Sequence, residues 1–90
     1  MGAMNYTTTD YVVAHAMEAD YEKTGQWQTL SLNSVASATN LTADQVNESV
    51  LRLGEGELIE KVNANEVEGR LRVTTFGKLT EEGRLLAQSR

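Results

Sequence analysis

The chain has 90 residues, 40% of them hydrophobic and 23% charged, which is typical of one small globular domain and too apolar for a disordered tail. Its 13 acidic and 8 basic side chains give a formal net charge of −5, which excludes binding to nucleic acid through bulk positive charge alone. The absence of cysteine excludes disulfides and thiolate zinc sites, and a single histidine, His15, supplies too few ligands for a transition metal, so we expect no metal and no cofactor.

No targeting signal and no membrane span are expected. The first residues lack a basic region followed by an apolar stretch, and the longest apolar runs are only a few residues long. The start, Met1-Gly2-Ala3-Met4, is typical of a cloning remnant before a native start at Met4, so residues 5–90 are expected to form a single domain. We therefore expect an intracellular, cytoplasmic protein.

The first predicted helix runs from about Thr8 to Lys23. Thr7 and Asp10 can cap its start, and apolar side chains recur at every fourth position along one face. These are Val13, Met17 and Tyr21. Alternating apolar residues then predict a short strand over Trp27–Leu32, followed by a short helix over Ser34–Thr39.

The next helix, Thr42–Leu53, has the clearest pattern. Thr42 and Gln45 have the spacing of a capping box, and Gly54 or Gly56 can end the helix. Its predicted buried stripe comprises Val46, Val50, Leu51 and Leu53. Its remaining side chains are expected to face mainly solvent: Ala43, Asp44, Asn47, Glu48, Ser49 and Arg52.

A long β-hairpin is predicted from Leu58–Asn65 and Arg70–Lys78. Its turn is placed at Val67-Glu68-Gly69, as a three-residue loop with a bulge in which Gly69 takes a positive φ. The alternative is a turn at Asn63-Ala64-Asn65-Glu66, which would leave Thr74–Lys78 irregular.

A last helix is predicted over Thr80–Gln88, with Leu85 and Leu86 directed inward. Together the elements predict a single core formed by one set of apolar side chains. These are Val13, Met17, Leu32, Val35, Val46, Val50, Leu53, Leu58, Ile59, Leu71, Val73 and Leu85.

Three segments resemble the winged helix-turn-helix DNA-binding domains of MarR-like and ArsR-like transcriptional regulators. Leu32–Thr42 is similar to their helix-turn-helix, Val46–Glu60 to the passage from recognition helix to wing, and Lys78–Arg84 to the start of the helix after the wing. Glu57, between Gly56 and Leu58, is a small departure from the usual Gly-Leu-Ile. The resemblance covers nearly all of the chain from Leu30 to Leu86. It implies an α+β fold with a three-helix core, a two-stranded β-hairpin wing and a C-terminal helix.

The resemblance also implies binding to double-stranded DNA, with Thr42–Leu53 entering the major groove and the hairpin contacting phosphate or the minor groove. Asparagine and glutamine can read adenine edges there, while arginine and lysine contact phosphates. The candidate DNA-binding residues are Thr42, Gln45, Asn47, Ser49, Arg52, Lys61, Arg70, Arg72 and Lys78.

Asp44 and Glu48 oppose this interpretation, because carboxylates on the recognition helix repel phosphates. The alternative hypothesis is a winged-helix protein–protein interaction module with an acidic docking face and no DNA binding. A halophilic source would also produce an acidic surface without saying anything about partners.

An enzyme is not expected. The sequence has one histidine, no cysteine, no glycine-rich phosphate loop and no nucleophile elbow.

A homodimer formed through the first and last helices is expected, with Tyr11 and Val12 at the contact. A two-fold axis lets one small domain read two half-sites.

Overall fold

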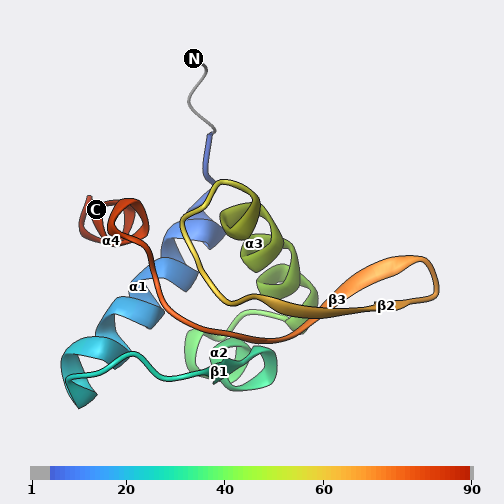
Figure 1. Ribbon diagram of the computed structural model, residues 1–90, viewed down its shortest axis with the longest axis horizontal. Coiled ribbons are helices and arrows are strands. Elements are labelled where there is room, and N and C mark those ends of the chain that lie inside the picture. The colour runs from blue at the N-terminus through green and yellow to red at the C-terminus, as the bar shows by residue number, and fades with distance from the viewer. Residues whose placement is uncertain (1–4, 90) are drawn as a thin grey trace.

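Four helices and a three-stranded antiparallel sheet make up residues 5–89, the part of the chain that the computed structural model describes (Figure 1). In chain order the elements are α1 (Thr8–Thr24), β1 (Leu30–Ser31), α2 (Leu32–Thr39), α3 (Ala43–Glu55), β2 (Asn63–Val67), β3 (Arg70–Phe76) and α4 (Glu81–Gln88). The predicted cloning remnant lies outside the described residues. Within them, no helix combines the length and hydrophobicity needed to cross a bilayer.

Local capping determines where the helices begin. The predicted capping boxes form at Thr7 with Asp10 and at Thr42 with Gln45. Ser31 caps α2 by accepting a hydrogen bond from the Ser34 N–H (3.1 Å), so this helix starts two residues before the predicted position. The predicted strand Trp27–Leu32 is correspondingly reduced to two residues, Leu30 and Ser31, which pair with β3.

The hairpin and the positive φ of Gly69 are confirmed, but the predicted three-residue loop with a bulge is wrong. Val67 pairs with Arg70 across a two-residue turn, Glu68-Gly69, in which φ is 52° and 80°. Two positive φ values are those of a type I′ turn, whose twist matches that of the strands. The register shift lies at the other end of the hairpin, between Asn63 and Ala64, so the alternative turn there is wrong as well.

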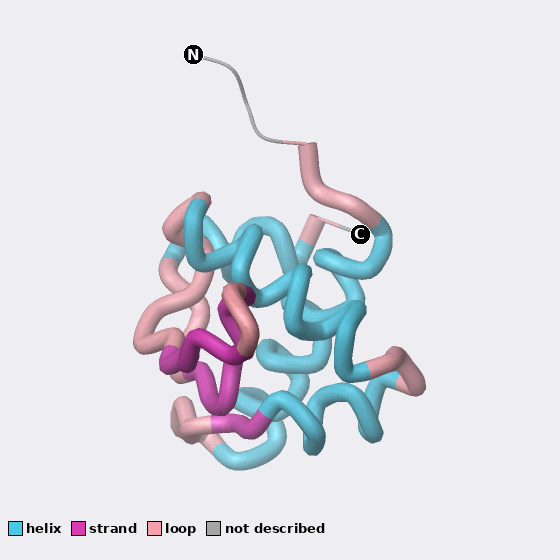
Figure 2. Tube along the Cα trace, turned by 90° about the vertical axis from the view of Figure 1, so that its right-hand side faces the viewer, coloured by secondary structure: helices cyan, strands magenta, loops and turns pink. Residues whose placement is uncertain are grey.

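The core lies where α1, α2 and α3 meet the inner face of the sheet. Figure 2 shows the strands gathered at one side of the helices, and Figure 1 shows β2 and β3 projecting beyond them as a wing. The predicted core is confirmed except for Leu71 and Leu85, whose exposed fractions are 54% and 63%. Phe76, Leu79 and Ala87 are also buried, in addition to the predicted set.

These two errors have different causes. Leu71 shares a strand face with buried Val73, but it lies two residues nearer the turn, where an open groove separates its side chain from α3. On α4, the side packed into the protein carries Gly83 and Ala87, one helical turn apart, and Leu85 points about 160–200° away from both.

Helix α1 is joined to α3 by an ion pair between Asp10 and Arg52. The carboxylate is fully buried, and it accepts from Arg52 Nε at 2.7 Å and Nη2 at 2.9 Å. Burial alone would raise the pKa of Asp10, but hydrogen bonds from Arg52 and from the Thr7 N–H outweigh it and lower the pKa below 3.8. Ser49 lies beside the same carboxylate. Its hydroxyl makes no hydrogen bond of normal geometry, so Ser49 contributes only a weak polar contact to Asp10.

A second buried carboxylate joins α1 to α4. Glu18 accepts from Arg84 Nε at 3.0 Å and Nη2 at 2.8 Å, and the hydrogen bond from Arg84 lowers the pKa of Glu18 despite burial. The Arg84 guanidinium also lies 4.9 Å above the ring of Tyr21, which stacks on Trp27. The two ion pairs fix α1 against α3 and α4.

Candidate nucleic-acid interface

The first turn of α3 is open to solvent, as a reading helix requires. Its inner side carries buried Val46 and Val50, whereas Thr42, Asp44 and Gln45 are exposed. The side chain of Gln45 is partly engaged, because its Oε1 accepts from the Thr42 N–H at 2.9 Å. Its amide nitrogen makes no hydrogen bond to any described residue and is available as a donor.

Asn47 and Ser49 are buried, so the prediction that they face solvent is wrong. Asn47 connects α3 to the wing: its Nδ2 donates to the Leu71 carbonyl at 3.2 Å, and its Oδ1 accepts from the Val73 N–H at 2.7 Å. Val73 pairs with Ala64, directly beside the register shift in the hairpin. The one hint in the sequence that Asn47 is buried is that it directly follows buried Val46. Its hydrogen-bond partner could not be found from nearby residues, because it lies more than 20 residues away.

Arg52 does not extend freely from α3. Its guanidinium is held by Asp10, and only 33% of the side chain is exposed. The expectation that Arg52 faces mainly solvent is therefore wrong.

The wing places Arg70 and Arg72 beside the start of α3. Arg70 is exposed and makes no ion pair with the described residues. Arg72 Nη1 lies 2.8 Å from Asp44 Oδ1, with both side chains partly or largely exposed. One of the two arginine charges is thus already compensated.

Lys61 and Lys78 lie apart from those arginines. They flank Gly77 at the base of the hairpin, next to Trp27 and the residues after it. Lys78 is six residues beyond Arg72, about 20 Å along an extended chain. The four basic residues therefore form two groups on the hairpin, not one continuous stripe.

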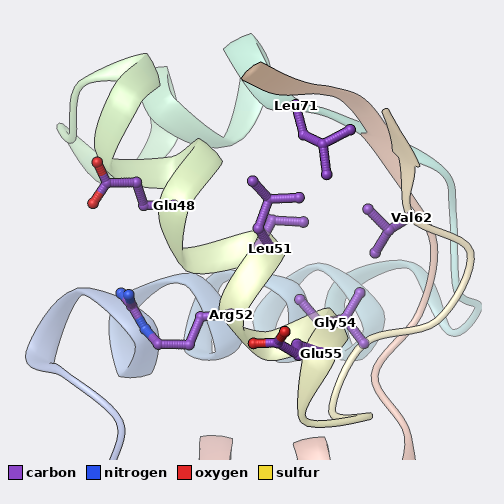
Figure 3. Close-up of a pocket in the computed structure, with 9 residues that line it drawn as sticks. Glu48, Leu51, Arg52, Gly54, Glu55, Val62 and Leu71 are labelled. Atoms are coloured by element: carbon purple, nitrogen blue, oxygen red, sulfur yellow. The ribbon is translucent and has the colours of Figure 1, made fainter. Parts of the chain in front are cut away.

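The outer side of α3 is acidic and borders an apolar groove. Asp44, Glu48 and Glu55 are exposed along the helix. Between α3 and the wing is a groove of about 810 Å³, in which Leu51 and Leu71 approach one another together with Val62 (Figure 3). The groove was not predicted, because Leu51 was assigned to the buried stripe of α3 and Leu71 to the core.

No arrangement for metal binding occurs in residues 5–89: no three histidine, cysteine, aspartate or glutamate side chains gather closely enough to hold an ion.

No protein-family model matches the sequence, and no curated protein matches it either. Solved structures do match. MepR, a transcription regulator of the Staphylococcus aureus multidrug efflux pump MepA, is 19% identical with a TM-score of 0.64, over 94% of this chain and 55% of its own. The adhesin competence repressor AdcR from Streptococcus pyogenes is also 19% identical, with a TM-score of 0.63 over 94% of this chain and 55% of its own. The fold is that of a winged helix-turn-helix domain.

The zinc-responsive MarR family member ZitR from Lactococcus lactis extends the same similarity, at 18% identity and a TM-score of 0.62, over 97% of this chain and 52% of its own. This winged helix domain spans about half the length of the regulators that it matches. At such identities the similarity establishes the α+β architecture, with α3 in the position of a recognition helix and β2–β3 as the wing. Function has to be argued from the site itself.

Proposed function

We propose that this winged helix domain binds double-stranded DNA as part of a transcriptional regulator, a role that also fits an intracellular protein. The observation that carries the proposal is the open first turn of α3 with Arg70 and Arg72 beside it on the wing. A helix N-terminus in the major groove can place polar side chains on base edges while the wing contacts the backbone.

The candidate residues have different roles in this proposal. Gln45 reads a base edge with its free amide nitrogen, and Thr42 lies near the DNA backbone. Arg70 contacts a phosphate directly. Arg72 has to exchange Asp44 for a phosphate, so its net contribution to affinity is smaller than that of Arg70.

The remaining candidates are reassigned or placed at the periphery. Asn47, Ser49 and Arg52 maintain the contacts of α3 with the wing and α1, and we no longer propose that they touch DNA. Lys61 and Lys78 contact phosphates only if the duplex extends along the hairpin to its base.

The test is a fluorescence-anisotropy titration of a labelled random-sequence duplex at several salt concentrations. Arg70→Ala should weaken binding to all sequences and reduce the slope of log K against log salt by about 0.9, the value for one phosphate. Lys23→Ala is the matched control, since Lys23 is an exposed cation in the last turn of α1, far along the chain from the wing. Equal effects of the two variants, or no binding at low salt, would refute the proposal.

Gln45→Ala tests base reading separately. It should lower affinity for a selected site by about 1–3 kcal/mol and relax the preference at one base pair, while leaving non-specific affinity unchanged. Glu48→Gln should strengthen non-specific binding, because it removes a carboxylate that repels phosphate. If no selected sequence emerges from a random pool, sequence-specific reading is ruled out.

We also propose that the domain self-associates through α1 and α4. Leu85 is an exposed leucine on α4, the helix packed on α1, where Tyr11 and Val12 are only partly buried. Leu85→Glu should shift a dimer toward monomer in sedimentation velocity, whereas Leu71→Glu, an equally exposed leucine on the wing, should not. A wild-type protein that stays monomeric at high concentration would contradict this part of the proposal.

A further inference from the structure

The groove beside the wing is longer than a single pocket. The hollow of about 810 Å³ reaches the end of α3 at Glu55, and a second hollow of about 400 Å³ reaches its start at Asp44. The two share Glu48, Leu51 and Leu71 as lining residues, so they adjoin along α3 and together are called the groove. From Asp44 to Glu55 it follows α3 for roughly 16 Å, at 1.5 Å per residue.

The floor of the groove is apolar, although it lies between α3 and the wing, where contact with DNA would require polar groups. Leu51 and Val62 are partly exposed, and Leu71 is 54% exposed. All three side chains extend into the space between α3 and the wing (Figure 3). These three side chains offer a small apolar surface that the apolar face of another chain could cover.

The wall formed by α3 carries net negative charge, whereas the wall formed by β3 carries Arg70 and Arg72 at the end near Asp44. The acidic part of the groove is therefore the half from Glu48 to Glu55. Glu48 and Glu55 are exposed and make no ion pair with the described residues, while the charge of Arg52 is compensated by Asp10. Figure 3 shows Glu48 on the side of α3 away from Val62, so its carboxylate lies at the outer rim. The carbonyl end of α3, next to Glu55, adds partial negative charge that also favours a cation.

We propose that this groove binds a helical segment of a partner protein that has apolar side chains on one face and lysine or arginine beside them. The apolar face would cover Leu51, Val62 and Leu71, and the basic side chains would meet Glu48 and Glu55. Duplex DNA fits this half of α3 poorly, because phosphates are repelled by the two carboxylates and an apolar floor offers base edges no hydrogen bonds.

This inference goes beyond the proposed DNA binding and does not depend on it. The groove ends at Asp44, in the same turn of α3 that is proposed to enter the major groove. A partner helix lying along the whole groove would therefore exclude DNA from that turn. The result would be a protein that releases DNA when the partner binds.

The experiment uses a synthetic amphipathic peptide of about 11 residues, built from leucine on one face and lysine on the other, which matches the length of the groove when helical. Two control peptides replace lysine by glutamate or leucine by serine. We expect saturable NMR shifts at Leu51, Val62 and Leu71 with the leucine–lysine peptide. Neither control should produce them.

Leu71→Ser should weaken binding of this peptide about tenfold, the equivalent of removing one partly buried leucine contact. Val67→Ser is the matched control, because Val67 is 50% exposed on the same hairpin but outside the groove lining. Glu55→Gln should weaken binding about threefold at low salt and less at high salt. Thermal unfolding confirms that each variant is folded.

Several results would overturn the inference. If the lysine–serine peptide bound as tightly as the leucine–lysine peptide, the binding would be explained by non-specific charge attraction. If Leu71→Ser weakened binding to duplex DNA as strongly as binding to the peptide, the groove would be a DNA-binding surface. If Leu71→Ser changed the mass measured by sedimentation, the groove would be a contact between copies of the chain. Failure of DNA binding alone would leave the peptide result unaffected.

Discussion

Asn47 provides the sharpest test of how α3 is used, because a base-reading role and a structural role predict different outcomes. Asn47→Ala removes the two hydrogen bonds to the Leu71 carbonyl and the Val73 N–H. The N–H belongs to a residue that is only 3% exposed, so it loses its partner without gaining water, at a cost of about 1–3 kcal/mol. The Leu71 carbonyl lies on an exposed residue and can be hydrated, which adds only about 0.5–1 kcal/mol.

Alanine also recovers about 0.5 kcal/mol of helix propensity, so the expected net loss is about 1–3 kcal/mol in the free energy of unfolding. In a domain of this size that corresponds to a fall in Tm of roughly 5–20 °C. Urea unfolding followed by circular dichroism measures the loss, and Glu48→Ala, an exposed position one residue along the same helix, is the control that should stay within about 0.5 kcal/mol.

Asn47→Asp refines the test. It keeps an acceptor for the Val73 N–H but directs a second acceptor at the Leu71 carbonyl, so it should also destabilise the domain. The reasoning would be refuted if Asn47→Ala unfolds like the wild type within about 0.5 kcal/mol while changing the base preferred in a selected DNA site.

Three further predictions concern stability. Because the pKa of Asp10 is lowered on folding, its ion pair with Arg52 stabilises the protein fully above the ordinary value of 3.8 and is lost as the pH falls through the lower, folded value. Urea unfolding at about pH 6 and about pH 3 should show this loss, and Asp10→Asn should be less stable at the higher pH but depend less on pH; an unchanged pH dependence would refute it. Gly83→Ala should destabilise the domain despite alanine's better helix propensity, since a Cβ there would clash with the Leu58 carbonyl oxygen, and a thermal melt at or above the wild-type Tm would contradict this. Glu68→Asn should stabilise the hairpin by about 0.5–1 kcal/mol, because asparagine tolerates the positive φ of a type I′ turn better than glutamate, and a lower Tm would count against that turn.

Sequence patterns predicted those parts of the fold that depend on nearby residues. The caps at Thr7 and Thr42, for example, arise from side chains that bond to the backbone three residues later. The buried stripe of α3 follows from helical periodicity alone. The order of the elements was sufficient to identify the winged helix.

The surroundings of the site could not be predicted in the same way, because they depend on contacts between distant residues. Asn47 is buried only because the wing strand lies against it, and Arg52 is compensated by a carboxylate 42 positions earlier. The exposure of Leu71 depends on the open groove between α3 and the wing, which alternation within one strand does not predict. Local patterns therefore identified α3 and the wing but not which of their side chains are free.

The wing is fastened to α3 at two levels, by Asn47 to the backbone of β3 and by Asp44 to Arg72. A hairpin attached only at its base could swing, and a ligand would have to immobilise it at an entropic cost. Here the two walls of the groove are held in register before anything binds. A molecule that enters between them gains contacts without ordering the hairpin, whereas a molecule that needs a wider opening has to break the Asn47 bonds first, so the space between α3 and the wing selects its occupants by size.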